Sequence, residues 1–218
     1  VTKLAHIHLT TNSESKARVL RLGEQEFRVH NVGNPGLDRL VEVETLSLAQ
    51  ISRNINFDVA EDEPYIILIQ HPLSSEIKDA YRQMTITLDA IKAVGIKTII
   101  SFPNSDAGGL EIIRAIAEYD SVPFIYSAKN IPRVDFVNLL RNAACLVGNS
   151  SSGILEAPLL KLPVINIGNR QIGRLHAENV QFVPHEKSAI VDAIQTAVYD
   201  ESYISVVKRC GNPYGDGN

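Results

Sequence analysis

The sequence predicts an α/β protein with a Rossmann-like, three-layer α/β/α architecture built on a parallel sheet. Two patterns support this class. From Tyr65 onward, short apolar runs alternate with longer segments of helical periodicity, which is typical of βαβ units with right-handed crossovers. The apolar runs are also continuous rather than alternating with polar residues, as expected of strands that helices cover on both faces.

The first 64 residues are less regular than the rest. We expect a strand at residues 4–9, a helix that begins near Asn12 or Ser13 and reaches about Leu22, and a second strand at 29–32. The Gly/Pro-rich segment 33–36 is the best linker candidate in the chain. A single helix is expected at residues 38–51, followed by a polar loop at 54–64.

The regular part of the chain follows this loop. Strands are expected at residues 65–70, 98–102, 123–126, 145–148, 164–167 and 180–183. Helical patterns cover residues 76–94, 109–118, 134–141 and 186–199. The C-terminal segment 211–218 consists of turn-forming residues without a closing helix.

Composition narrows the class of protein. The 218 residues are 44% hydrophobic and 21% charged, with a formal net charge of −4, which argues against a general nucleic-acid binder. No apolar run approaches the length of a membrane span, and no signal peptide is visible. Two cysteines do not make a disulfide framework, so the cytoplasm is the expected compartment. Because the chain starts with Val1 inside an apparent strand, we expect it to be part of a longer protein.

The segment 145–174 carries the strongest chemical signal and reads CLVGNSSSGILEAPLLKLPVINIGNRQIGR. It places Ser150 and Ser151 at a helix N-terminus, where free N–H groups and the helix dipole favour an anion. Glu156 lies close enough to reach a sugar hydroxyl attached to that anion, and Arg170 follows the next strand at the same edge of the sheet. Taken singly, the serines are better explained as helix caps, Glu156 as a solvated side chain and Arg170 as a partner in a surface ion pair, and only their combination favours a binding site.

Two other strand ends carry polar residues. His71, held by the following Pro72, is placed to face a ligand, although it is also placed to cap the next helix. Asn104 lies in the loop FPNSDAGG, whose composition alone indicates ordinary turn chemistry. The histidines of the first strand, His6 and His8, make a weak case for a metal because no third ligand accompanies them.

The motifs GNSSSGILE, LPVINIGNRQIGR and ENV together resemble the UDP-N-acetylglucosamine 2-epimerase family. They are most similar to its hydrolysing branch, which releases free N-acetylmannosamine and UDP. The non-hydrolysing branch typically has the signature D-S-G-G-x-x-E-E here. This chain departs from that signature because it has Asn149, three serines and a single acid, Glu156.

The resemblance implies one half of a GT-B fold (UDP-glycosyltransferase/glycogen phosphorylase-like), in which two Rossmann-like domains face each other across a cleft. Residues 1–36 would then be the end of the N-terminal domain and the crossing, and residues 37–218 the C-terminal UDP-binding domain. The tail resembles the family signature Y-G-D-G-N-A, after which a last helix returns to the first domain. Both ends of the chain are therefore expected to be truncated, and the first domain would supply most of the catalytic acids and bases.

The resemblance also assigns roles to individual residues. Ser150 and Ser151 would donate to phosphate, Arg170 would balance its charge, and Glu156 would accept from both ribose hydroxyls. His71 is the candidate catalytic residue, near the β-phosphate. Substrate binding would further involve Asn104, which helps to hold the nucleotide, and Ile131, which packs on the uracil ring. Neither a metal nor a cofactor is required by these residues.

The expected function is hydrolysis of UDP-N-acetylglucosamine (UDP-GlcNAc) to N-acetylmannosamine and UDP, in the biosynthesis of sialic-acid-type sugars. The chain alone is expected to be inactive. Three alternatives stay open: a GT-B glycosyltransferase, a non-hydrolysing 2-epimerase, or a non-catalytic UDP-binding domain. A modified substrate such as a diacetamido sugar also stays open. The expected partners are UDP-GlcNAc and UDP, with no nucleic acid and no membrane, and a homo-oligomer is expected.

Overall fold

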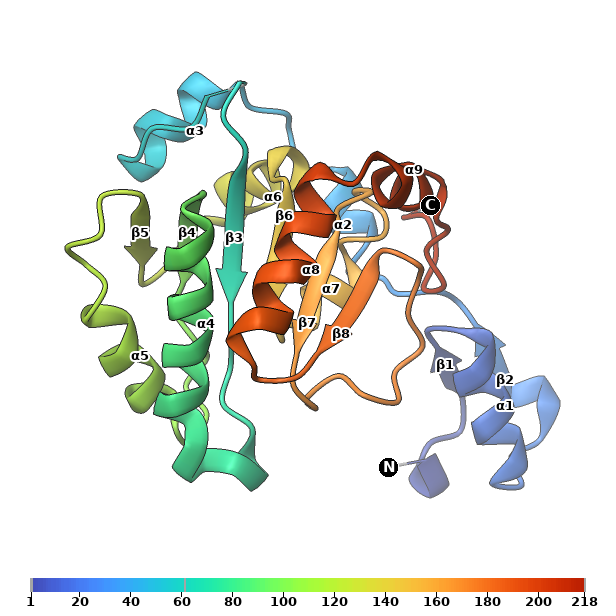
Figure 1. Cartoon of the computed structure of the whole chain (residues 1–218). Coiled ribbons are helices and arrows are strands. Elements are labelled where there is room, and N and C mark those ends of the chain that lie inside the picture. Colours follow the sequence, from blue (N-terminus) through green and yellow to red (C-terminus); the bar gives the residue numbers. More distant parts are fainter. Residues whose placement is uncertain (1, 61, 218) are drawn as a thin grey trace.

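The computed structural model describes residues 2–60 and 62–217. It shows a six-stranded parallel sheet between two layers of helices, with a smaller N-terminal unit beside it (Figure 1). This confirms the predicted Rossmann-like α/β class. Val1, Glu61 and Asn218 lie outside the described residues, so the expectations for the start of the chain, the loop 54–64 and the tail are not tested at these three positions.

The main sheet has the strand order β5-β4-β3-β6-β7-β8, and all its neighbouring strands are parallel. The strands are β3 (Tyr65–Ile69), β4 (Lys97–Ser101), β5 (Ile125–Ala128), β6 (Cys145–Gly148), β7 (Val164–Ile167) and β8 (Val180–Val183). The chain first adds strands on one side of β3 and then, from β6, on the other. Ligands bind open α/β sheets at the carboxyl ends of the strands beside such a switch point, which here lies between β3 and β6.

Helices cover both faces of the sheet. One face packs against α4 (Ala80–Val94), α5 (Gly109–Ala117) and α8 (Lys187–Tyr199). The other face packs against α2 (Asp38–Val41), α3 (Leu48–Ile55), α6 (Arg133–Asn142) and α7 (Ser152–Leu155). Strand residues alternate between the two cores: Ile66 faces α4 and α8, whereas Ile67 faces the α6 side. Because both faces are buried, β3 is apolar throughout, which explains its continuous apolar sequence.

The single helix expected at residues 38–51 is wrong, because the structure has two short helices, α2 and α3, separated by six residues. Two side chains of α6 hold this connection in place. Asn138, which is fully buried, donates to Glu44 O at 2.9 Å, and Arg141 donates to Val43 O at 2.9 Å. A capping box between Ser47 and Gln50 then starts α3. Tertiary hydrogen bonds therefore override the local helical periodicity.

Other differences are smaller. The strand expected at residues 4–9 is reduced to β1 (His8–Thr10), because Thr2–Leu4 forms a 3₁₀ turn, and the helix expected from residue 76 begins with a 3₁₀ segment, Ser74–Asp79, before α4. The strand expected at 123–126 is shifted toward the C-terminus as β5. The α-helix α9 (Glu201–Arg209) was not predicted. Its N-cap is Asp200, whose side chain accepts hydrogen bonds from the N–H groups of Ser202 and Tyr203.

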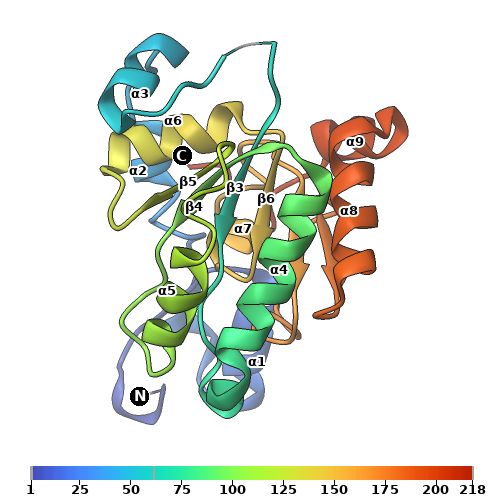
Figure 2. The same cartoon turned by 60° about the vertical axis from the view of Figure 1, so that its left-hand side comes forward.

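The N-terminal unit consists of β1, α1 (Ser13–Arg21) and β2 (Val29–Asn31), with β1 and β2 paired in parallel as a sheet of their own. It lies on the side of the main sheet where the strands end, as two views of the ribbon agree (Figures 1 and 2). The chain leaves it through the predicted linker at 33–36, where Asn34 N–H donates to Tyr214 O at 2.7 Å. The linker and the C-terminal tail are thus hydrogen-bonded to each other.

At Gly148 the end of β6 lies directly against the backbone of β3. It has a φ of +122°, and a side chain there would clash with the backbone carbonyl of Ile69. We expect Gly148→Ala to lower the free energy of unfolding in urea by about 3 kcal/mol or more, from backbone strain together with overpacking. Gly211→Ala is the matched control, because its added methyl group meets no atom within 4 Å and its φ is not in the left-handed region. A loss of the same size in both variants would contradict the close-approach argument.

Candidate functional site

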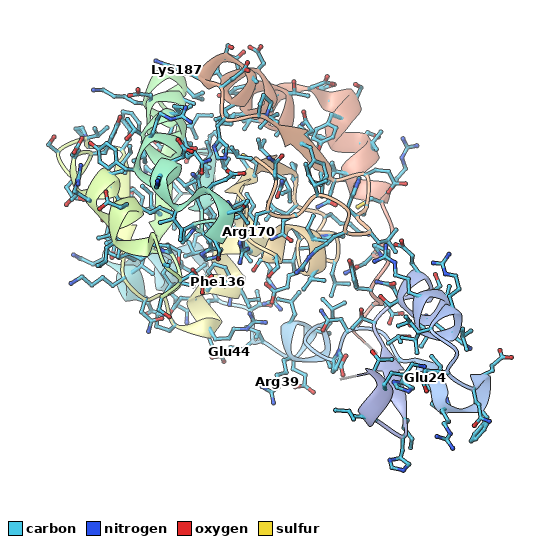
Figure 3. The ribbon with its side chains drawn as sticks, turned by 90° about the horizontal axis from the view of Figure 1, so that it is seen from below. Glu24, Arg39, Glu44, Phe136, Arg170 and Lys187 are labelled. Atoms are coloured by element: carbon cyan, nitrogen blue, oxygen red, sulfur yellow. The ribbon has the colours of Figure 1, made fainter. Side chains whose placement is uncertain are left out.

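The carboxyl ends of the strands form the edge of the sheet that faces the viewer in Figure 3, with Arg170 near its centre. The loops after β3, β4, β6 and β7 meet there. They bring together four predicted site residues or their backbones: His71 after β3, Asn104 after β4, Ser150 after β6 and Arg170 after β7. The hydrogen bonds between these loops define the geometry of the candidate site.

Asn149 connects the first and third of these loops. It directly follows β6 and is 5% exposed. Its Oδ1 accepts from the N–H of His71 at 2.7 Å, and its Nδ2 donates to the carbonyl of His71 at 2.9 Å. The side-chain amide therefore pairs with both backbone polar groups of His71, as a residue of a neighbouring strand would, and it extends the β3–β6 ladder beyond the pair Ile69–Gly148.

The imidazole of His71 is fixed from the other side. Its Nδ1 accepts the backbone N–H of Asn104 at 3.1 Å, so the neutral ring carries its proton on Nε2. Burial, and to a smaller extent the positive charge of Arg170, lower the pKa of His71 to about 4, although Asp106 acts in the opposite direction. The ring is thus a neutral hydrogen-bond donor at physiological pH in the ligand-free protein.

The side chain of Arg170 reaches from the loop after β7 to the loop after β6. Its Nη1 donates to the backbone carbonyl of Asn149 at 3.1 Å, and the neighbouring Gln171 donates to the same carbonyl at 2.9 Å. Burial, together with the positive charge of Arg174, lowers the pKa of Arg170, whereas Asp106 raises it. The guanidinium remains charged because an arginine pKa starts far above neutrality. A partly buried cation of this kind favours an anionic ligand.

The turn from β6 into α7 contains Ser150 and Ser151 and is called the serine turn below. Ser151 is the N-cap of α7, and the Oγ of Ser150 accepts from the N–H of Ser152 at 3.3 Å. Gly153 lies against Val164, so that a side chain there would press on the neighbouring strand. The turn therefore lies close against the sheet, with half-buried serines beside Asn149.

Glu156 and Ile131 both lie on the α6 side of the sheet. The side chain of Glu156 is 16% exposed, and its Oε1 accepts from Arg133 Nη1 at 3.0 Å. Glu156 is the C-cap of α7, one residue beyond Leu155, the last residue of this short helix. Ile131 packs, partly buried, on the core of this face two residues before Arg133.

A family model described as UDP-N-acetylglucosamine 2-epimerase matches residues 1–218. The chain belongs to this family. A protein of Legionella pneumophila named UDP-N,N'-diacetylbacillosamine 2-epimerase (hydrolyzing) is 34% identical over 217 residues, which are 100% of this chain and 56% of that protein. Polysialic acid biosynthesis protein P7 of Escherichia coli is 33% identical over 98% of this chain and 54% of its own length. The chain thus spans just over half the length of these relatives.

The fold of this epimerase-family chain also matches solved structures. A crystal structure of UDP-GlcNAc 2-epimerase from Neisseria meningitidis, bound to UDP-GlcNAc, superimposes with a TM-score of 0.83. The sequences are 18% identical, and the match covers 100% of this chain but 60% of that one. At this identity the likeness establishes the fold: the chain has the architecture of one half of a GT-B protein.

Three residues at the site were not singled out from the sequence, namely Asn149, Gln171 and Arg133. Asn149 and Gln171 lie within the motifs that indicated the family, but no periodicity shows that their side chains turn inward. A polar residue directly after a strand-ending glycine was the available signal for Asn149. Gln171 is 1% exposed, and its Oε1 has no hydrogen-bond partner among the described residues.

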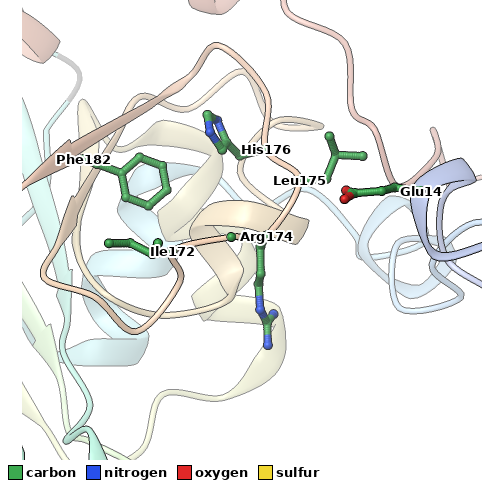
Figure 4. A pocket seen from close by; sticks show the side chains of 7 residues that line it. Glu14, Ile172, Arg174, Leu175, His176 and Phe182 are labelled. Carbon is green, nitrogen blue, oxygen red and sulfur yellow. The ribbon is translucent and has the colours of Figure 1, made fainter. Parts of the chain in front are cut away.

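A cavity of about 430 Å³ adjoins the site in this epimerase-family chain (Figure 4). It is lined by the loop 172–176 that follows Arg170, by Phe182 of β8, and by Glu14 of the N-terminal unit. A neighbouring cavity of about 330 Å³ shares Arg174 and Glu14 and extends to Asn34 of the segment 33–36 and to Tyr214 of the C-terminal tail. Together these hollows lie between the N-terminal unit and the carboxyl edge of the sheet.

Within residues 2–60 and 62–217, no group of three or more His, Cys, Asp or Glu side chains is arranged to hold a metal ion. In the same residues, no helix is both long enough and apolar enough to cross a membrane.

The lowered pKa of His71 predicts how stability depends on pH. The unfolded chain takes up the proton near pH 6.5, whereas the folded chain takes it up near pH 4. The stability that neutral His71 contributes is therefore lost as the pH falls between these values. We expect wild type to lose more unfolding free energy than His71→Asn when urea titrations are repeated from about pH 8 to about pH 4.5. The variant keeps an acceptor for Asn104 N–H, and parallel curves would show that His71 titrates normally.

Proposed function

We propose that this chain supplies the UDP-binding half of a hydrolysing UDP-N-acetylglucosamine 2-epimerase. The main support for this proposal is the hydrogen-bonded cluster at the switch point between β3 and β6. There Asn149 joins His71 to Arg170, and the serine turn follows directly. A neutral donor, a cation and a turn at a helix start make a site for a diphosphate.

The diphosphate would lie over the loops after β3, β6 and β7. Ser150 and Ser151 would donate to its oxygens, and Arg170 would balance its charge. In a partly buried site such contacts are stronger than in water, because the surrounding dielectric constant is lower. Diphosphate binding would also raise the pKa of His71, since a nearby anion favours the protonated ring.

The nucleoside would extend toward the α6 side of the sheet. Glu156 would accept from the ribose hydroxyls, with Arg133 holding one of its carboxylate oxygens. Ile131 would pack on the uracil ring, and Asn104 would complete the nucleotide contacts from the loop after β4. These roles are proposals that rest on the family resemblance together with the positions described above.

The proposed reaction begins with anti-elimination of UDP across C1–C2 of the sugar, which breaks the C1–O bond and gives a glycal, and ends with addition of water. Negative charge develops on the diphosphate as that bond breaks. A donor already aimed at the leaving oxygen stabilises this charge more than it stabilises the bound substrate. His71 is the residue we assign to that role, with Nε2 as the donor atom. The base that removes the C2 proton is not among the residues assigned here.

The substrate class we propose is a UDP-linked 2-acetamido sugar, with UDP-GlcNAc as the member to test first. The names of the relatives support this class, since one acts on a diacetamido sugar and another serves polysialic acid biosynthesis. The product N-acetylmannosamine would then feed the formation of sialic-acid-type sugars. A cytoplasmic location is part of the proposal and is supported by two free, buried cysteines. A homo-oligomer is proposed on the family resemblance alone.

Glu156→Ala tests the ribose assignment. Loss of a charged hydrogen-bond acceptor should weaken UDP binding by about 1.5–3 kcal/mol, measured by calorimetry. The same variant should lose much less affinity for 2′-deoxy-UDP, because that ligand offers one fewer hydroxyl to the carboxylate.

Arg133→Gln is the matched control for this experiment. It breaks the ion pair with Glu156 while leaving the carboxylate in place. We expect it to cost less affinity than Glu156→Ala and to keep the preference for UDP over the deoxy analogue. Equal losses for both ligands in Glu156→Ala would contradict the ribose assignment.

Turnover by the 218-residue chain alone is not expected. The chain spans just over half the length of its relatives, and selective stabilisation of a transition state needs both walls of a GT-B cleft. Incubation of the purified chain with UDP-GlcNAc should therefore release no N-acetylmannosamine above the uncatalysed rate. Measurable release, free of any full-length enzyme, would show that the chain contains the base as well.

A further inference from the structure

Asn149 makes more contacts within the site than any role in capping or turn formation requires. Its side chain uses both polar atoms on the peptide of His71, at 2.7 and 2.9 Å. Its carbonyl accepts from Arg170 at 3.1 Å and from Gln171 at 2.9 Å. Its own N–H donates to Ile69 O at 3.0 Å. One buried residue is thus bonded to the loops after β3 and β7 while it belongs to the loop after β6.

We propose that Asn149 is a positioning residue, which fixes His71 and Arg170 relative to each other on the diphosphate side of the site; this inference rests on the proposed function. The reach of a hydrogen bond to a rigid carbonyl sets where the guanidinium lies. The paired amide sets the direction in which the chain leaves β3, and hence where the imidazole is held. Small displacements of such groups lower the reaction rate, because preorganised donors stabilise the transition state only in the correct geometry.

The chemistry of the side chain at this position is restricted. Asparagine offers an amide N–H donor and an amide oxygen acceptor on a short, planar group that matches a peptide, whereas glutamine carries the same amide one methylene farther from the backbone. Aspartate has nearly the same shape, but an ionised carboxylate accepts only, so it would leave the carbonyl of His71 facing another oxygen. It would also place a negative charge beside His71 and Arg170, where an anionic ligand is expected to bind.

The His71 imidazole reports on this positioning without any ligand. Its charged neighbours are Arg170 and Asp106, and Asn149→Ala removes neither of these charges. If Asn149 holds the ring in its buried place, loss of the amide exposes the ring, and its pKa moves up toward 6.5. The Nδ1 acceptor bond to Asn104 N–H would also weaken, so that a second neutral tautomer becomes populated.

The experiment is a nitrogen-15 NMR titration of His71 in wild type, Asn149→Ala and Asn149→Asp, combined with UDP calorimetry and melting temperature. We expect the pKa of His71 to rise by about one unit or more in Asn149→Ala and further in Asn149→Asp. UDP affinity should fall about tenfold in Asn149→Ala, and more in Asn149→Asp. If Asn149→Ala does not fold, the nearly isosteric Asn149→Asp decides the outcome through the ring tautomer, because its added charge raises the pKa of His71 and weakens UDP binding in either case.

Asn179→Ala is the matched control. Asn179 is also a fully buried asparagine that donates to a backbone carbonyl, Leu162 O at 2.9 Å, but it lies before β8 at the opposite edge of the sheet. It should lower the melting temperature without changing the titration of His71 or the UDP affinity. The proposal is overturned if Asn149→Ala leaves the pKa, the tautomer and the UDP affinity unchanged and loses only stability. A wild type that binds no UDP would overturn the proposed function, whereas the ligand-free titration would still decide the positioning role.

Discussion

The close approach of β3 and β6 at Gly148 is the constraint on which the site depends. It is possible because residue 148 has no side chain and adopts a positive φ, which brings Asn149 within hydrogen-bonding distance of His71. Without that approach, the backbone N–H and carbonyl of His71 would lose their hydrogen bonds to the Asn149 side chain, and the loop after β3 would be free to move. The position of Arg170 depends on the same residue, because its guanidinium bonds to the carbonyl of Asn149.

The electrostatics of the site follow from this packing. Burial favours the neutral form of His71. Arg170 lies nearby, and it forms no ion pair with a carboxylate of residues 2–60 or 62–217. A neutral donor and an unbalanced cation together favour an anion that can accept hydrogen bonds. On the α6 side the charge is balanced instead, because Glu156 is paired with Arg133. The two halves of the site are thus suited to different parts of one ligand, a charged part and a hydroxylated part.

The sequence predicted the fold well where burial dictates the pattern. The strands of the main sheet are buried on both faces, so their apolar runs marked them within two or three residues, as with β6 and β7 at 145–148 and 164–167. It failed where distant side chains decide, as in the connection after α2, which Asn138 and Arg141 of α6 hold. The strand ends also placed His71, Ser150 and Arg170 at one edge, as expected. The ion pair of Glu156 and the central position of Asn149 could not be predicted, because they depend on side-chain directions across loops far apart in sequence.

The central claim is that a nucleoside diphosphate binds at the carboxyl edge, over the switch point. A titration of the isotope-labelled chain with UDP, followed by amide proton–nitrogen NMR spectra, tests it most directly. We expect saturable shifts concentrated at His71, Asn104 and residues 149–153, with smaller shifts near Ile131 and Glu156. Residues at the opposite edge, such as Asn179 and those around Lys161, should stay unchanged. Shifts centred on that opposite edge, or no saturable shifts at all, would contradict the account.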